Sequence, residues 1–152
     1  MAPTAYADDA VESILVPTDG SDAATAALER ALSIADASDA VVHVLAVVDV
    51  TTAPLEFDVE FVDRLERAKT GLVEDVVAAY EGHEAGVTGD VRRGRPAQVI
   101  VQYADEHDID LIVLGRTGRD GLTKPFLGST TRRVTRSAPV PVLVVPASSG
   151  GD

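Results

Sequence analysis

Short apolar runs rich in β-branched residues alternate along this chain with segments whose apolar residues recur every three or four positions. This alternation is typical of an α/β fold, in which helices cover both faces of a parallel sheet. Strands are expected at residues 13–17, 40–50, 86–94, 108–115 and 138–146. Helices are expected around residues 24–35, 58–84, 96–104 and 129–137.

The character of each run predicts its place in the sheet. "AVVHVLAVVDV" (40–50) is apolar at nearly every position, as in a strand buried on both faces, whereas "GVTGDVRRG" (86–94) is polar and suits a sheet edge. In the long helix, Phe61, Leu65, Leu72, Val76 and Ala79 are expected along one side. In the helix opened by Pro96, the expected buried stripe consists of Ala97, Ile100, Val101 and Ala104.

A chain of 152 residues with 45% hydrophobic residues fits one domain with its own core. We expect an N-terminal extension at 1–12, the domain at 13–147 and a frayed tail at 148–152. The N-terminus lacks the features of a secretory signal, and no apolar run is long enough to span a membrane, so a cytoplasmic protein is expected. There are no cysteines, and the three histidines lie far apart in sequence, so no metal site is predicted.

The formal net charge is -12, and we interpret the acidity as a halophilic-type surface, suited to a salt-rich cytoplasm, rather than as an acidic binding function. It argues against binding to nucleic acids or anionic membranes. Residues 115–136 differ from the rest, since they hold five arginines, one lysine and a single acid. A coat of solvated cations on a helix would explain such a segment; the surrounding glycines and hydroxyls favour an anion site instead.

Two loops are expected at this anion site. Gly115, Gly118 and Gly121 allow backbone N–H groups to turn toward one concavity, and Gly128 and Ser129 precede a helix whose first N–H groups attract anions. The second loop, "PTDGS" (17–21), follows the first strand. In doubly wound sheets ligands bind where the strand order reverses, so neighbouring first and fourth strands would bring both loops together. The standard GxxxxGK[ST] and GxGxxG motifs are absent.

The glycines follow the pattern GxxGx9G[ST], from Gly115 and Gly118 to Gly128 and Ser129, which resembles the ATP-binding signature of the universal stress protein family. Further blocks of the resemblance are "SILVPTDGS", "VLAVVD", "GRPAQVIVQYA", "DLIVLGRTGRDGL" and "LGSTTRRVTRSAPVPVLVVP". The resemblance implies a single doubly wound, five-stranded parallel sheet of order 3-2-1-4-5 that binds ATP, ADP or AMP, with or without Mg²⁺, at the switch point. The implied nucleotide-binding residues are Pro17, Thr18, Asp19, Val47, Gly115, Arg116, Thr117, Gly118, Arg119, Gly121, Gly128, Ser129, Thr130 and Thr131.

Two details of this assignment stay open at the level of sequence. Asp19 suits a ribose hydroxyl or a bound cation, but Asp19, Ser21 or Asp22 could equally cap the first helix. Family members often carry a small hydroxyl residue and then a histidine after the first glycine, where this chain has Arg116 and Thr117. That departure would change the outer contacts of the loop and leave its glycines in place.

The sequence favours a nucleotide-binding stress-response or signalling module over an enzyme. Near the signature the carboxylates are Asp19 and Asp120, and nothing resembles a nucleophile–base pair, so any hydrolysis of ATP should be slow. The alternatives are a nucleotide-free dimeric module that acts through protein partners, and a slow ATP hydrolase. The apolar fifth strand is expected at a sheet edge and predicts a homodimer through Val140 to Val145, where Pro139 and Pro141 restrict pairing to the later residues.

Overall fold

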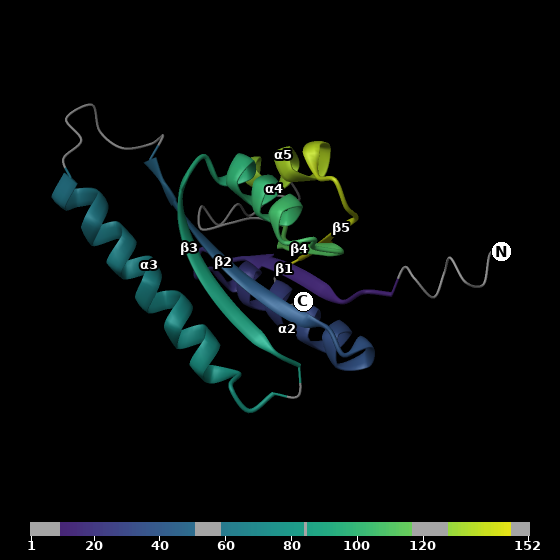
Figure 1. Ribbon diagram of the computed structural model, residues 1–152. Helices are drawn as coiled ribbons and strands as arrows, with labels where there is room; N and C mark the ends of the chain where they lie inside the picture. The colour runs from purple at the N-terminus through teal and green to yellow at the C-terminus, as the bar shows by residue number, and fades with distance from the viewer. Residues whose placement is uncertain (1–9, 51–58, 84, 117–127, 147–152) are drawn as a thin grey trace.

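The fold was analysed in a computed structural model that describes residues 10–50, 59–83, 85–116 and 128–146. The chain alternates strands with helices throughout this part (Figure 1). The strands are β1 (Ser13–Pro17), β2 (Val41–Asp49), β3 (Val87–Gly94), β4 (Leu111–Gly115) and β5 (Val142–Val145). The helices are α2 (Asp22–Ser38), α3 (Val59–Ala79), α4 (Pro96–Glu106) and α5 (Ser129–Ser137).

Within the described residues the five strands form one sheet in the order β3-β2-β1-β4-β5, and every pair is parallel. This confirms the predicted fold class and strand order. Helices α2 and α3 cover one face of the sheet, and α4 and α5 cover the other (Figure 1). The reversal of strand order falls between β1 and β4.

The core lies in two layers, one on each side of the sheet. Successive residues of a strand point to opposite faces, so Ile14 and Val16 pack against α2, while Leu15 packs against α4. The three residues are fully buried, as expected for a central strand of a parallel sheet. The small side chains of α2, among them Ala27 and Ala31, are also fully buried and allow this helix to lie close to the strands.

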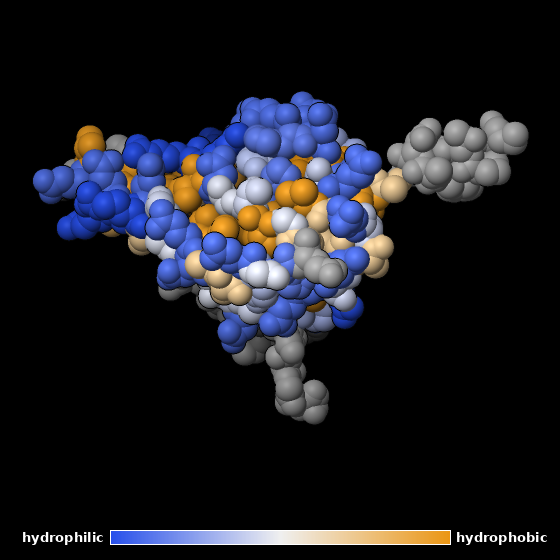
Figure 2. All heavy atoms as spheres, turned by 60° about the horizontal axis from the view of Figure 1, so that its bottom comes forward, coloured by the Kyte–Doolittle hydropathy of each residue, from blue (hydrophilic) through white to orange (hydrophobic). Residues whose placement is uncertain are grey.

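The position of α3 differs from the sequence prediction. The helix ends at Ala79 rather than near Glu84, and its buried residues are Val62 and Val73, while Leu65 is only partly buried. The physical reason is that α3 lies over β2 and β3 at the edge of the sheet, where neighbours cover it on one side only. Figure 2 turns the bottom of Figure 1 forward and shows apolar side chains across the middle of that face, with hydrophilic side chains around them.

The helix α4 begins at Pro96, as predicted, and buries Val99, Ile100, Tyr103 and Ala104. Two of these were expected from the sequence; Val101 and Ala97 are instead only partly buried. None of the helices in the described part of the chain is long and apolar enough to cross a membrane.

Candidate functional site

The ends of β1 and β4 lie side by side at the point where the strand order reverses. Ile14 pairs with Leu111 and Leu15 with Ile112 in a parallel register, so both strands end at the same edge of the sheet. The segment after Pro17 and the segment after Gly115 therefore start next to each other, although about 100 residues separate them in sequence. This is the edge at which open α/β sheets bind their ligands.

Hydrogen bonds to nearby residues hold the turn after β1. The Thr18 N–H donates to the Leu45 carbonyl in the middle of the neighbouring strand β2 (2.8 Å), and the Gly20 N–H donates to the Thr18 Oγ1 (3.1 Å). The Ser21 N–H donates to Asp19 Oδ1 (3.0 Å). Gly20 has φ 83°, a conformation that residues with a side chain rarely adopt. The turn is thus fixed in shape before any ligand binds.

Ser21 is the N-cap of α2, which answers the question that the sequence left open. Its Oγ accepts a hydrogen bond from the Ala24 N–H (3.2 Å), and its backbone is extended. Asp19 shapes the turn through Oδ1 and is not the capping residue. Its proposed contact with a ribose or a cation stays a prediction.

Gly115 allows the end of β4 to pack directly on the first turn of α2. A Cβ atom added to Gly115 would lie 2.8 Å from the backbone carbonyl and the Cβ of Ala23, in the first turn of α2. No real side chain fits at that distance, so β4 can pass this close to α2 only with glycine at its last position. The first glycine of the signature therefore has a packing role of its own, apart from any contact with a ligand.

The start of α5 is tied back to the end of β4. The Gly128 N–H donates to the Arg116 carbonyl (2.8 Å), and the Thr131 hydroxyl donates to the Gly115 carbonyl (2.8 Å). Thr131 is only 5% exposed, and this bond is partly buried. The Arg116 N–H in turn donates to the Val145 carbonyl of β5 (2.8 Å). Together the three bonds set where α5 begins relative to β4.

The first turn of α5 has the electrostatic character of an anion site. Its N-cap is Gly128, which offers no side-chain cap, and its first turn holds no acidic residue. Ser129 is exposed and Thr130 partly exposed, so their N–H and hydroxyl groups are open to a ligand. Unpaired N–H groups at a helix N-terminus carry the positive end of the helix dipole and stabilise a phosphate or carboxylate.

The structure thus brings together most of the described residues that were predicted for the site: the turn at Pro17, Thr18 and Asp19, the strand end at Gly115 and Arg116, and residues 128–131. Val47 lies on β2, two residues beyond Leu45, partly buried against the α4 face. Thr117, Gly118, Arg119 and Gly121 lie outside the described residues. Sequence reasoning missed Ala23 and Leu45; the small residues in "DAAT" were the available signal for the first of them.

A second polar cluster lies on the α4 face, toward the start of β2. His43 Nδ1 is 2.9 Å from the Tyr103 hydroxyl, and the His107 ring stacks on Tyr103 with centroids 3.9 Å apart. The Arg92 guanidinium lies over the Tyr103 ring, 4.8 Å from its centroid. Burial lowers the pKa of His43, and the nearby His107 lowers this pKa further. Burial raises the pKa of Tyr103.

Comparisons with known proteins agree with this architecture. The family model described as "Universal stress protein family" matches residues 10–146. Universal stress protein MJ0531 of Methanocaldococcus jannaschii is 38% identical over 137 residues, which cover 87% of this chain and 80% of that protein. The structure of universal stress protein UspA from Lactobacillus plantarum superposes with a TM-score of 0.80 at 32% identity, over 89% of this chain and 97% of that one. A universal stress protein solved in complex with cAMP superposes with a TM-score of 0.66 at 27% identity, over 91% of this chain and 99% of that one.

Proposed function

Because this chain belongs to the universal stress protein family, we propose that it binds an adenine nucleotide at the ends of β1 and β4. A structural neighbour at 27% identity was solved with cAMP, which supports a nucleotide as the ligand class. The finer proposal is ATP, ADP or AMP, with or without Mg²⁺. The protein would then act as a stress-response or signalling module whose conformation or partners depend on the bound nucleotide.

The observation that carries this proposal is the attachment of α5 to β4. The bond from Thr131 to the Gly115 carbonyl and the bond from Gly128 to the Arg116 carbonyl hold the uncapped first turn of α5 at the end of β4, the strand next to β1. A fixed set of backbone donors suits phosphate, because little conformational entropy is lost when the ligand binds. In this proposal Ser129 and Thr130 add hydroxyl donors to the same group.

The remaining roles follow from the chemistry of each residue. Asp19 would accept hydrogen bonds from ribose hydroxyls or face a cation, since bare phosphate would repel it. Val47 would contact the adenine through its backbone, and Pro17 and Thr18 would line the adenosine end. Thr117, Gly118, Arg119 and Gly121 would surround the phosphates. We propose slow hydrolysis or none, because the site residues offer no pair of nucleophile and general base.

We further propose that the protein forms a homodimer through β5. The outer side of this strand faces no other strand among the described residues, and Leu143 is 37% exposed. A short apolar edge of this kind is stabilised by pairing with a second copy. The bond that joins Val145 to Arg116 would link such a dimer to the nucleotide site.

The nucleotide proposal can be tested by changing the charge at the start of α5. Ser129→Asp places a carboxylate at an exposed position in the first turn of α5. There the carboxylate interacts favourably with the helix dipole but repels a phosphate. Like charges about 4 Å apart cost roughly 1–4 kcal/mol at a solvent-exposed site, so ATP affinity should fall at least about fivefold. Ser129→Asn, similar in size and uncharged, is the matched control and should bind nearly as the parent does.

Calorimetric titration with ATP, ADP and AMP, combined with thermal unfolding, separates the possible outcomes. We expect Ser129→Asp to unfold at or slightly above the parent temperature while its affinity drops. Equal affinity of the parent and Ser129→Asp would refute a phosphate at this position. No heat with any of the three nucleotides would instead favour the nucleotide-free dimeric module.

A further inference from the structure

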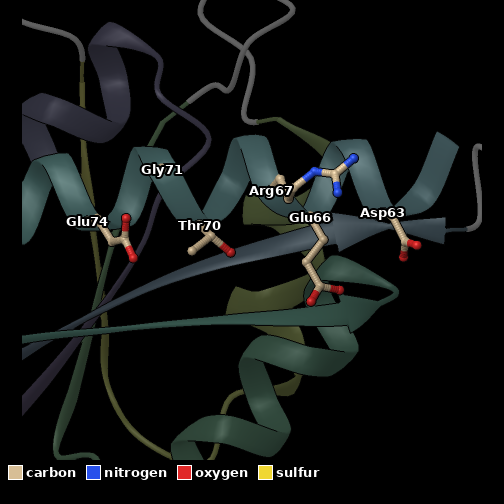
Figure 3. Close-up of a pocket in the computed structure, with 6 residues that line it drawn as sticks. All are labelled: Asp63, Glu66, Arg67, Thr70, Gly71 and Glu74. Atoms are coloured by element: carbon tan, nitrogen blue, oxygen red, sulfur yellow. The ribbon is translucent and has the colours of Figure 1, made fainter. Parts of the chain in front are cut away.

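A groove runs along the outer side of α3 and reaches the free edge of β3 at one end. Two hollows of about 420 and 360 Å³ lie end to end along it and share Glu74. Figure 3 shows the first hollow, with Asp63, Glu66 and Glu74 projecting from the same side of α3. The second hollow reaches β3 at Gly89. The groove lies far along the sheet order from β5 and does not include any residue of the proposed nucleotide site.

The edge of β3 presents backbone groups to this groove. The Val42 N–H donates to the Gly86 carbonyl, so Gly86 faces β2. The backbone groups of successive residues in a strand point to alternate sides, so Val87, Gly89 and Val91 face away from β2. The Val91 N–H is occupied, because it donates to Asp90 Oδ1 (2.8 Å). Val87 and Gly89 therefore offer the stretch of edge on which a further strand could pair.

Gly89 is the point at which helix and strand come closest. A Cβ added there would lie 2.2 Å from Val73 Cγ1 and 3.0 Å from Val77 Cγ2. These two valines pack on one face of Gly89 and form an apolar floor beside the strand edge, while Gly89 itself remains exposed. The exposed backbone of Gly89 leaves room for an extended peptide beside the strand edge.

Carboxylates line the rim of this half of the groove. Glu74 and Glu81 are both exposed and belong to no ion pair found among the described residues. The other half is different: Arg93 binds both Asp63 and Glu66, and Arg67 adds a further cation. Negative charge is therefore available to a partner at the end near Gly89 and is already neutralised at the opposite end.

We infer that the groove beside Gly89 binds an extended, basic segment of a partner protein, which adds to the edge of β3 as a further strand. Backbone pairing with Val87 and Gly89 would supply affinity, and Glu74 and Glu81 would select lysine or arginine side chains. A second copy of this chain is disfavoured as the occupant, because its net charge is -12. A nucleic acid is disfavoured for the same reason, since the rim would repel its phosphates.

The inference can be tested with a blocked heptapeptide of alternating lysine and valine. The protein carrying Glu74→Gln and Glu81→Gln is compared with a protein carrying Glu29→Gln and Asp105→Asn, exposed positions on α2 and α4. Both double variants lose two negative charges, so any effect of net charge alone is the same in each. Peptide affinity and amide chemical shifts are measured by NMR titration at a fixed salt concentration.

We expect the groove variant to bind the peptide about fivefold more weakly than the control variant. In the parent protein the largest shift changes should occur at Val87, Gly89 and the facing side of α3. A peptide with proline at its central position lacks one backbone donor and should bind more weakly than the parent peptide. A peptide with glutamate in place of lysine should not bind.

Three results would overturn the inference. One is equal affinity of the two double variants, which would reduce the effect to net charge. Another is undiminished binding of the proline peptide, which would exclude strand pairing. The third is a set of shift changes centred away from β3. Nucleotide binding plays no part in these measurements, so their failure would leave the proposed nucleotide site untouched.

Discussion

The two edge strands of the sheet, β3 and β5, differ in length and in polarity. β3 has eight residues, and its sequence "VTGDVRRG" contains an aspartate and two arginines. β5 has four residues, "VLVV", and exposes Leu143. A polar edge strand stays hydrated and resists pairing with a second copy, whereas a short apolar edge strand is stabilised when a partner buries it.

Ion pairs made by the arginines of β3 add to the difference between the two edge strands. Arg93 of β3 pairs with Glu66 and Asp63 of α3, and on the other face Arg92 pairs with Glu106 of α4 (2.9 Å). Ion pairs thus connect β3 to α3 on one face of the sheet and to α4 on the other. The groove beside β3 is the proposed binding site of a charged partner. We expect self-association at β5 and recognition of other proteins at β3.

The largest effect is expected from a substitution that forces β3 away from α3. Gly89→Val would place a Cβ 2.2 Å from Val73 Cγ1, so the helix or the strand must shift. Overpacking of this kind should lower the free energy of unfolding by about 2–3 kcal/mol, measured by urea denaturation. Gly86→Ala is the control, because its Cβ would meet Val41 at an ordinary 3.7 Å and should cost little. Similar losses in both variants would contradict the proposed close contact.

The next effect is expected at the opposite edge. Leu143→Glu puts a charge on the exposed apolar position of β5, so the proposed homodimer should dissociate at least about a hundredfold more readily, with the monomer still folded. Thr88→Glu places the same charge on an exposed position of β3 and should leave the dimer intact. Sedimentation equilibrium distinguishes the two variants. A monomeric parent protein would refute the proposed dimer. A dimer that Thr88→Glu disrupts would place the dimer interface at β3 instead of β5.

The contrast between the edges was largely predictable from the sequence. The polar character of 86–94 predicted an edge strand, whereas the edge position of the apolar segment 138–146 came from the strand order that the family resemblance implied; that order is confirmed. Binary patterns report burial well, because burial depends on which face of an element points inward. The rule for doubly wound sheets predicted that the turn after Pro17 and the strand end at Gly115 would lie together if the first and fourth strands were neighbours, and these strands do pair.

What the sequence did not predict depends on distances between elements. The burial of Val62 and Val73 instead of Leu65 and Leu72 reflects how α3 is rotated over the sheet edge, and periodicity leaves that rotation undetermined. Likewise, several residues could have capped α2, and only the backbone geometry selects Ser21. The packing role of Gly115 against Ala23 is also a matter of tertiary distance; from sequence the glycine suggested a ligand alone.

The smallest effect is expected at the cluster that connects β2 to α4 beneath the polar edge. Burial lowers the pKa of His43 from its ordinary value of 6.5, with a further contribution from His107, so the unfolded chain binds more protons than the folded protein on the acid side of 6.5. The free energy of unfolding should therefore fall as the pH is lowered through this range. The other ionisable groups nearby are Tyr103, Asp90, Arg92 and Glu106.

His43→Gln retains a side chain that can form a hydrogen bond with Tyr103 and should flatten this dependence of stability on pH. His107→Gln should flatten it less, because burial is the larger cause of the shift. Urea denaturation between about pH 7.5 and pH 5 measures both slopes, and an unchanged slope in His43→Gln would show that the cluster does not couple protonation to the stability of this side of the sheet.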